Sequence, residues 1–97
     1  MIGARATFCA GHKLPQHEEV HGHSYVVWAY TDTWGDAEAW QKFLQSICAK
    51  FDHRMLGPDL GKMEQLAEVI GQNTMARRVE IKRPVEGLCC EWESGAW

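Results

Sequence analysis

The chain has 97 residues, of which 45% are hydrophobic and 24% charged, and its formal net charge is −3. This length fits a single domain spanning residues 1–97, and the composition is that of a globular protein. A negative net charge without a Lys or Arg run argues against a nucleic-acid partner. No long apolar stretch follows the N-terminus, so we expect neither a secretion signal nor a membrane span, and a cytoplasmic location.

Two stretches near the N-terminus favour β-strands. Residues 4–10 tolerate extended structure and lead into His12, and residues 21–31 are rich in aromatic and β-branched side chains, which suit a pleated surface. The segment between them, residues 13–20, contains a proline and several polar side chains. We expect it to form an exposed loop that closes a hairpin and returns His21 toward His12.

Two segments whose apolar residues recur at helical spacing follow the predicted hairpin, and each would form one apolar stripe on a helix. Asp36 offers an N-cap to a first helix that should end near Asp52, and its apolar residues recur at helical spacing. These residues are Trp40, Leu44, Ile47 and Phe51. After a break at Pro58, a second stripe has the same spacing. It consists of Met63, Leu66, Ala67, Ile70 and Thr74.

Residues 78–82 and 87–93, around a turn with Pro84, predict a final hairpin. The resulting order ββααββ predicts an α+β fold, in which two helices cover one face of a four-stranded antiparallel sheet. The uncovered face would carry a large apolar patch, which favours self-association. The aromatic residues expected on it are Trp28, Tyr30 and Trp92.

The four cysteines are predicted to be reduced thiols, because two are adjacent and no export signal is present. No Cys-x-x-Cys spacing supports a structural zinc site, so a metal would depend on histidine. Cys89 and Cys90 could be regarded as nucleophiles, but small buried apolar residues are the interpretation that we favour.

Three histidines have the spacing of a metal site. His21 and His23 are two residues apart on a predicted strand, so their side chains leave the same face. His12 lies at the end of the neighbouring strand. Three imidazoles with an open fourth position are typical of catalytic zinc. The alternative is that the His-Gly-His segment is a polar turn, and spacing alone leaves both interpretations open.

Three segments carry a known pattern: residues 7–14 read TFCAGHKL, residues 20–25 read VHGHSY, and residues 51–56 read FDHRML. They resemble the 6-pyruvoyltetrahydropterin synthase family, which includes the 6-carboxytetrahydropterin synthases of queuosine biosynthesis. Their order and spacing agree with the family pattern, and the resemblance covers nearly the whole chain.

The resemblance implies a tunnelling fold (T-fold) whose sheets join by their edges into a barrel, commonly as a homo-hexamer. It also implies that His12, His21 and His23 hold Zn²⁺, which binds the side-chain hydroxyls of 7,8-dihydroneopterin triphosphate. The expected function is therefore that of a lyase, which acts on this pterin or a close relative.

Other site residues also follow from the resemblance. Asp52 and His53 match the family's acid/base pair, although without the family they read as a polar helix end. The queuosine branch has a catalytic cysteine where this chain has His17, and Glu18 fits a subfamily form in which glutamate is the catalytic group. Its alternative role is that of a solvated loop carboxylate. Glu64 matches the glutamate of the second helix and is assigned to substrate binding.

The terminal hairpin departs from the family. Where the family has a Glu-Thr-Pro-like turn that accepts hydrogen bonds from the pterin, this chain has Lys82-Arg83-Pro84, and neither cation accepts hydrogen bonds. Two alternatives to the lyase follow. The chain could keep the fold and the zinc without catalysis, as a binding or interaction module, or it could act on another substrate, whose anionic group Arg83 would meet.

Overall fold

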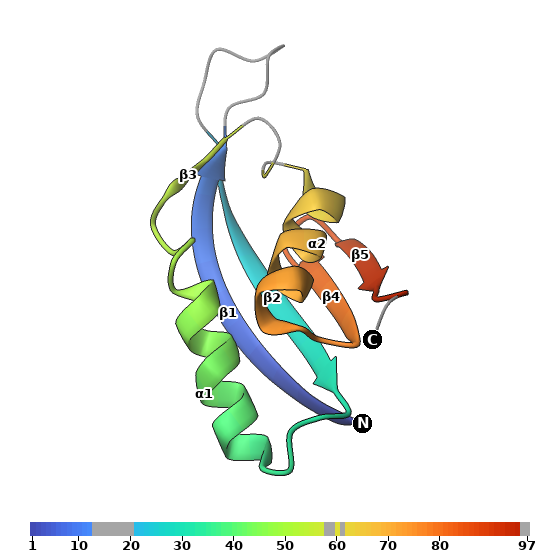
Figure 1. The fold of residues 1–97 in the computed structure, drawn as a ribbon. Helices are drawn as coiled ribbons and strands as arrows, with labels where there is room; N and C mark the ends of the chain where they lie inside the picture. The colour runs from blue at the N-terminus through green and yellow to red at the C-terminus, as the bar shows by residue number, and fades with distance from the viewer. Residues whose placement is uncertain (13–20, 58–59, 61, 96–97) are drawn as a thin grey trace.

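The computed structural model describes residues 1–12, 21–57, 60 and 62–95, with the backbone alone for His12 and His21 (Figure 1). The elements in chain order are β1 (Ile2–His12), β2 (His21–Thr31), α1 (Ala37–Cys48), β3 (Met55–Leu56), α2 (Met63–Thr74), β4 (Arg78–Arg83) and β5 (Leu88–Glu93). The fold is α+β as predicted, and no described helix has the length and apolar character needed to cross a bilayer.

The sheet has five strands in the order β3-β1-β2-β4-β5, so the predicted four-stranded antiparallel sheet and the order ββααββ were wrong in detail. The additional strand is β3, which lies between the two helices in sequence and pairs in parallel with the end of β1 through Gly11 and His12. Two residues are too few to show the alternation by which strands are found in a sequence. The sheet is therefore mixed rather than purely antiparallel.

The long hairpin of β1 and β2 organises the molecule. Its ladder runs without interruption from the pair Ile2 and Thr31 to the pair His12 and His21. Alternate side chains are buried under the helices. On β1 and β2 these are Ala4, Ala6, Phe8, Ala10, Tyr25, Val27, Ala29 and Thr31. We call this side the helix-covered face and the opposite side the open face.

Both helices pack on the helix-covered face, α1 against β1 and α2 against β4 and β5 (Figure 1). The small alanines of β1 allow α1 to approach closely, and the indole nitrogen of Trp40 donates to the Ala29 carbonyl at 2.9 Å. The predicted N-cap is confirmed, because Asp36 Oδ1 accepts from the backbone N–H groups of Glu38 and Ala39. The amphipathic stripes thus form the core as expected.

The first helix ends at Cys48, four residues before the predicted end near Asp52. The apolar spacing gave a wrong helix end because Phe51 belongs to a turn and yet packs on the core. Its ring centroid lies 5.8 Å from that of Phe8. The turn closes at His53, whose φ of 56° is left-handed and cannot continue a helix. Because α1 ends at Cys48, the chain that follows runs along the outer edge of β1.

Trp92 does not belong to the open face. It pairs with the buried Val79 across β4 and β5, and so its ring packs against α2 on the helix-covered face. Trp28 and Tyr30 are half-buried residues of the open face, where the Arg78 guanidinium lies 5.7 Å from the Tyr30 ring centroid. The predicted apolar patch is therefore smaller than expected and is bordered by charge.

The cysteines are free thiols, and the prediction that Cys89 and Cys90 are buried holds only in part. Cys90 packs against the core, and burial raises its thiol pKa, whereas Cys89 is exposed on the open face.

Replacing Gly71 with alanine is expected to destabilise the fold. A Cβ at this position would lie 2.2 Å from the Trp92 ring, closer than any real contact. Because overpacking a core costs about 1–3 kcal/mol, we expect the free energy of unfolding in urea to fall by about that amount. The matched control is Gly35→Ala, since a Cβ at Gly35 meets no atom within 4 Å. Equal stability of the two variants would contradict the packing described here.

Candidate active site at the end of the first hairpin

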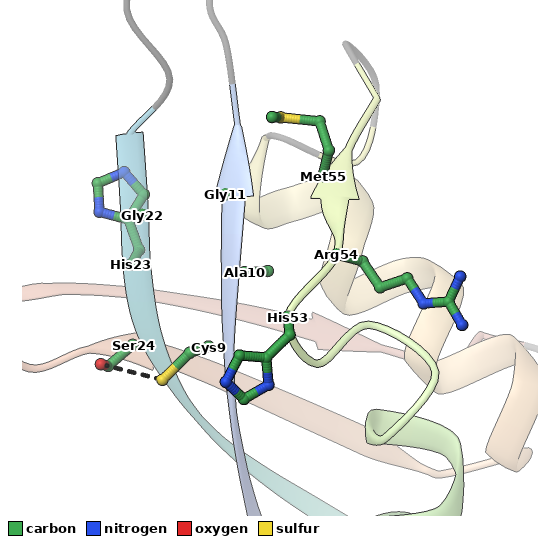
Figure 2. A pocket seen from close by; sticks show the side chains of 9 residues that line it. All are labelled: Cys9, Ala10, Gly11, Gly22, His23, Ser24, His53, Arg54 and Met55. Carbon is green, nitrogen blue, oxygen red and sulfur yellow. Dashed lines mark hydrogen bonds between the residues drawn. The ribbon is translucent and has the colours of Figure 1, made fainter.

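A hollow of about 530 Å³ lies at the end of the hairpin where His12 pairs with His21 (Figure 2). Three segments meet there: the end of β1, the start of β2, and the turn that leads into β3. The lining residues are Cys9, Ala10, Gly11, Gly22, His23, Ser24, His53, Arg54 and Met55.

The floor of the hollow is a strip of backbone with few side chains. Gly11 pairs with Gly22 on one side and with Met55 on the other, so the centre of the strip carries no side chain on the open face. Next along the hairpin, Cys9 pairs with Ser24, and their Sγ and Oγ atoms are 3.5 Å apart (Figure 2). The strip leaves room for a flat ligand between polar groups.

Hydrogen bonds hold Asp52 and His53 at the outer edge of β1. Asp52 Oδ1 accepts from the Cys9 backbone N–H at 2.9 Å, and the His53 N–H donates to the Cys9 carbonyl at 2.6 Å. The Gly11 N–H in turn donates to the Arg54 carbonyl at 2.9 Å. These bonds hold the turn in place as a short continuation of the sheet.

The same turn forms an acid/base pair. Asp52 Oδ2 lies 3.0 Å from His53 Nδ1, and the imidazole is 84% exposed at the hollow. The Cys9 N–H, followed by the neighbouring His53, lowers the pKa of Asp52 below its ordinary value, so the carboxylate stays ionised. An ionised carboxylate beside Nδ1 orients the imidazole.

A second polar cluster lies beside His23 on the helix-covered face. Arg83 Nη2 is 2.9 Å from His23 Nδ1 and 3.1 Å from Nε2, and Glu86 Oε1 is 3.3 Å from Nδ1. Arg83 Nε donates to Glu86 at 2.8 Å, and this bond is the main cause of a lowered Glu86 pKa. Next to the cluster, burial raises the pKa of Tyr25, whose hydroxyl has no hydrogen-bond partner among the described residues.

The backbone brings the predicted metal ligands together. The backbone of His12 pairs directly with that of His21, and His23 pairs with Ala10 on the helix-covered face. Within the part of the chain whose side chains are described, no three His, Cys, Asp or Glu residues are grouped to hold a metal. The side chains of His12 and His21 lie outside that part, so the metal site stays a prediction.

The other predicted residues are spread more widely. Glu18 lies outside the described residues. Glu64 is exposed in the first turn of α2, where its charge acts on Cys90, and it does not line the hollow. Arg83 lies beside His23 rather than alone on the hairpin turn.

Sequence reasoning missed Glu86, Tyr25 and the pair of Cys9 with Ser24. Glu86 follows Pro84 in the turn of the last hairpin, and attention to acids in that turn could have found it. The position of Tyr25 follows from the alternation in β2, but nothing in the sequence indicates that its hydroxyl lacks a partner.

A family model described as 6-pyruvoyl tetrahydropterin synthase matches residues 1–86. The chain belongs to this family. The match includes every residue that lines the hollow, together with Arg83 and Glu86. A search of curated proteins finds no match.

Membership in the 6-pyruvoyl tetrahydropterin synthase family confirms the resemblance seen in the sequence and implies a T-fold. It indicates a pterin synthase-like protein, and an enzyme of the lyase type. Within this fold the candidate site is the hairpin end, where His23 and His53 line the hollow.

Proposed function

We propose that this protein is a zinc-dependent lyase that acts on 7,8-dihydroneopterin triphosphate or a close relative, as a 6-pyruvoyl- or 6-carboxytetrahydropterin synthase does. The observation that supports it best is the hairpin end, where His12 pairs with His21. The adjoining hollow is lined by His53, which Asp52 orients.

The histidines suit zinc by their chemistry and their placement. Three histidines on two directly paired strands match the donor set of a catalytic zinc with an open fourth position. Such an ion would polarise a coordinated hydroxyl and stabilise developing negative charge. His12, His21 and His23 would hold it.

His53 is the group proposed to move protons. Imidazoles exchange protons near neutral pH, and the exposed ring of His53 can reach a ligand in the hollow. Asp52 keeps the ring oriented through Nδ1, so the proton exchanged with substrate is that on Nε2. Glu18 is proposed as a further catalytic group, and Glu64 and Arg83 as substrate-binding residues.

The site is proposed to be shared between copies of the chain in a homo-oligomer, as the family's barrel assembly implies. Within one chain, the pair of Asp52 and His53 lies at the outer edge of β1, whereas His23 shares the helix-covered face with Ala10. A second copy would bring an acid/base pair to the metal from another side. By family resemblance the oligomer is a hexamer.

A non-catalytic binding module is the main competing function, and the altered turn at Lys82 and Arg83 favours it. A different, anionic substrate is less well supported. Arg83 already contacts the Glu86 carboxylate at 2.8 Å, so much of its charge is compensated within the protein.

Incubation of the zinc-loaded protein with 7,8-dihydroneopterin triphosphate tests the proposal. We expect turnover to a pyruvoyl- or carboxy-tetrahydropterin, which mass spectrometry identifies by its mass, and the product names the branch of the family, including the queuosine branch. Unchanged substrate in the presence of folded, zinc-bound protein would contradict the lyase and favour the binding module.

A further inference from the structure

We infer that the open face at the hairpin end holds a ring-binding subsite, in which a flat heterocycle lies over Gly11 and Gly22 with Met55 as its apolar wall. The identity of the ring, a pterin, rests on the proposed function. The subsite itself does not depend on zinc, because none of its contacts involves a predicted metal ligand. It gives a role to Met55, an exposed residue of the short strand β3.

The floor of this subsite is bare backbone. Gly11 pairs with Gly22 across β1 and β2, and with Met55 across β1 and β3. Neither glycine has a positive φ, and a Cβ built on Gly22 would meet no described atom within 4 Å. Glycine inside a strand commonly marks a place where a ligand or another backbone approaches closely. Since the hollow lies over this floor, a ligand can make that approach here.

Met55 forms the wall of the subsite. Its side chain is 57% exposed, whereas the next residue, Leu56, is buried in the core. Figure 2 shows the Met55 side chain extending from β3 toward β1, while the Arg54 side chain points away from the strip. A thioether is flexible and polarisable, and it makes favourable contacts with aromatic rings. A ring on the strip would cover this exposed apolar side chain, which favours binding.

Cys9 and Ser24 form the polar end of the strip. Both residues are exposed, and their Sγ and Oγ atoms lie 3.5 Å apart. A hydroxyl both donates and accepts hydrogen bonds, so Ser24 can accept from an N–H group of a heterocycle. The side chains of Lys82 and Arg83 offer no such acceptor in the last hairpin.

The size of the hollow and its neighbours fit a small heterocycle. The hollow measures about 530 Å³, and small-molecule sites commonly measure about 300–1,000 Å³. His53 lies two residues before Met55 and lines the same hollow. A ring on the strip would therefore lie beside the group that is proposed to move protons.

Binding of neopterin to the zinc-loaded protein tests the subsite. Neopterin carries the pterin ring without the triphosphate, and its fluorescence reports binding directly. We expect Met55→Ala to weaken the affinity about tenfold, because the ring loses its apolar contact. Met55→Leu keeps an apolar side chain of similar volume and should bind nearly as tightly as wild type. The matched control is Leu88→Ala, which removes an exposed apolar side chain away from the hollow and should bind as wild type does.

Alkylation of cysteine locates the bound ring. Cys9 and Cys89 are both exposed, and of the two only Cys9 lines the hollow. We expect saturating neopterin to slow the reaction of Cys9 with iodoacetamide and to leave that of Cys89 unchanged, as measured by mass spectrometry of the peptides.

The outcomes separate the subsite from the proposed reaction. Wild-type affinity in Met55→Ala, equal reaction of Cys9 with and without neopterin, or a wild type that binds no neopterin would overturn the inference. Turnover of 7,8-dihydroneopterin triphosphate alongside any of these results would leave the lyase standing. Protection of Cys9 without turnover would keep the subsite and contradict the lyase.

Discussion

Replacing His21 with alanine is expected to weaken zinc binding by more than about 100-fold. Loss of an outer partner already costs about 10- to 100-fold, and loss of a direct ligand removes a bond to the ion itself. His21 is the most informative of the three predicted ligands, because its backbone pairs directly with that of His12 and it lies two residues from His23 in the sequence. Chelator competition measures the affinity, and metal analysis after gel filtration measures the stoichiometry.

The matched control is His17→Ala, which removes an imidazole four residues before His21 in the sequence. His17 is not a predicted ligand, so its replacement should leave zinc binding unchanged. If His17→Ala loses the ion and His21→Ala retains it, the assignment of ligands is wrong. If neither variant changes the affinity, any bound zinc lies elsewhere in the chain.

Replacing His53 with asparagine is expected to lower kcat by about 10²- to 10⁴-fold, the usual range for loss of a general acid or base. Asparagine is the appropriate choice because it tolerates left-handed backbone, and His53 has a φ of 56°. The imidazole is 84% exposed, so the stability of the fold should change little. Steady-state kinetics with 7,8-dihydroneopterin triphosphate measure the effect.

Zinc content and urea unfolding of His53→Asn should match those of wild type, since the imidazole is largely exposed and, among the described residues, contacts Asp52. Lys50→Gln is the matched control, because Lys50 is an exposed residue of the same turn and does not line the hollow. An unchanged kcat in His53→Asn would show that another group moves the proton. A parallel loss of zinc would show that the two parts of the site are not independent.

Local patterns in the sequence were sufficient for much of the fold. The bounds of β2 were predicted from its aromatic and β-branched residues, and those of α2 from helical spacing. The end of α1 was not predictable in the same way, because Phe51 keeps its apolar contact from a turn. A two-residue strand such as β3 exists through its partner β1, and a single sequence does not show that partner.

The candidate site shows the same difference between short motifs and contacts over a long sequence separation. The motif around His21 and His23 and the pair of Asp52 with His53 are short segments, so sequence reasoning could propose them. The hydrogen bond from Cys9 to Asp52 spans 43 residues, and the contact of Arg83 with His23 spans 60. Contacts at such separation depend on the register of strands, which no local pattern contains.

The unbroken ladder between β1 and β2 has a thermodynamic consequence for the predicted metal site. A slip of one residue would move every side chain of the hairpin to the opposite face, and the buried alanines and Tyr25 oppose that slip. Formation of the sheet therefore offsets the conformational entropy that is lost when His12 and His21 are aligned, and it does so before any ion binds. Unlike a zinc finger, whose chain orders only around its metal, this hairpin should keep its circular dichroism spectrum and its cooperative unfolding after zinc is stripped with a chelator.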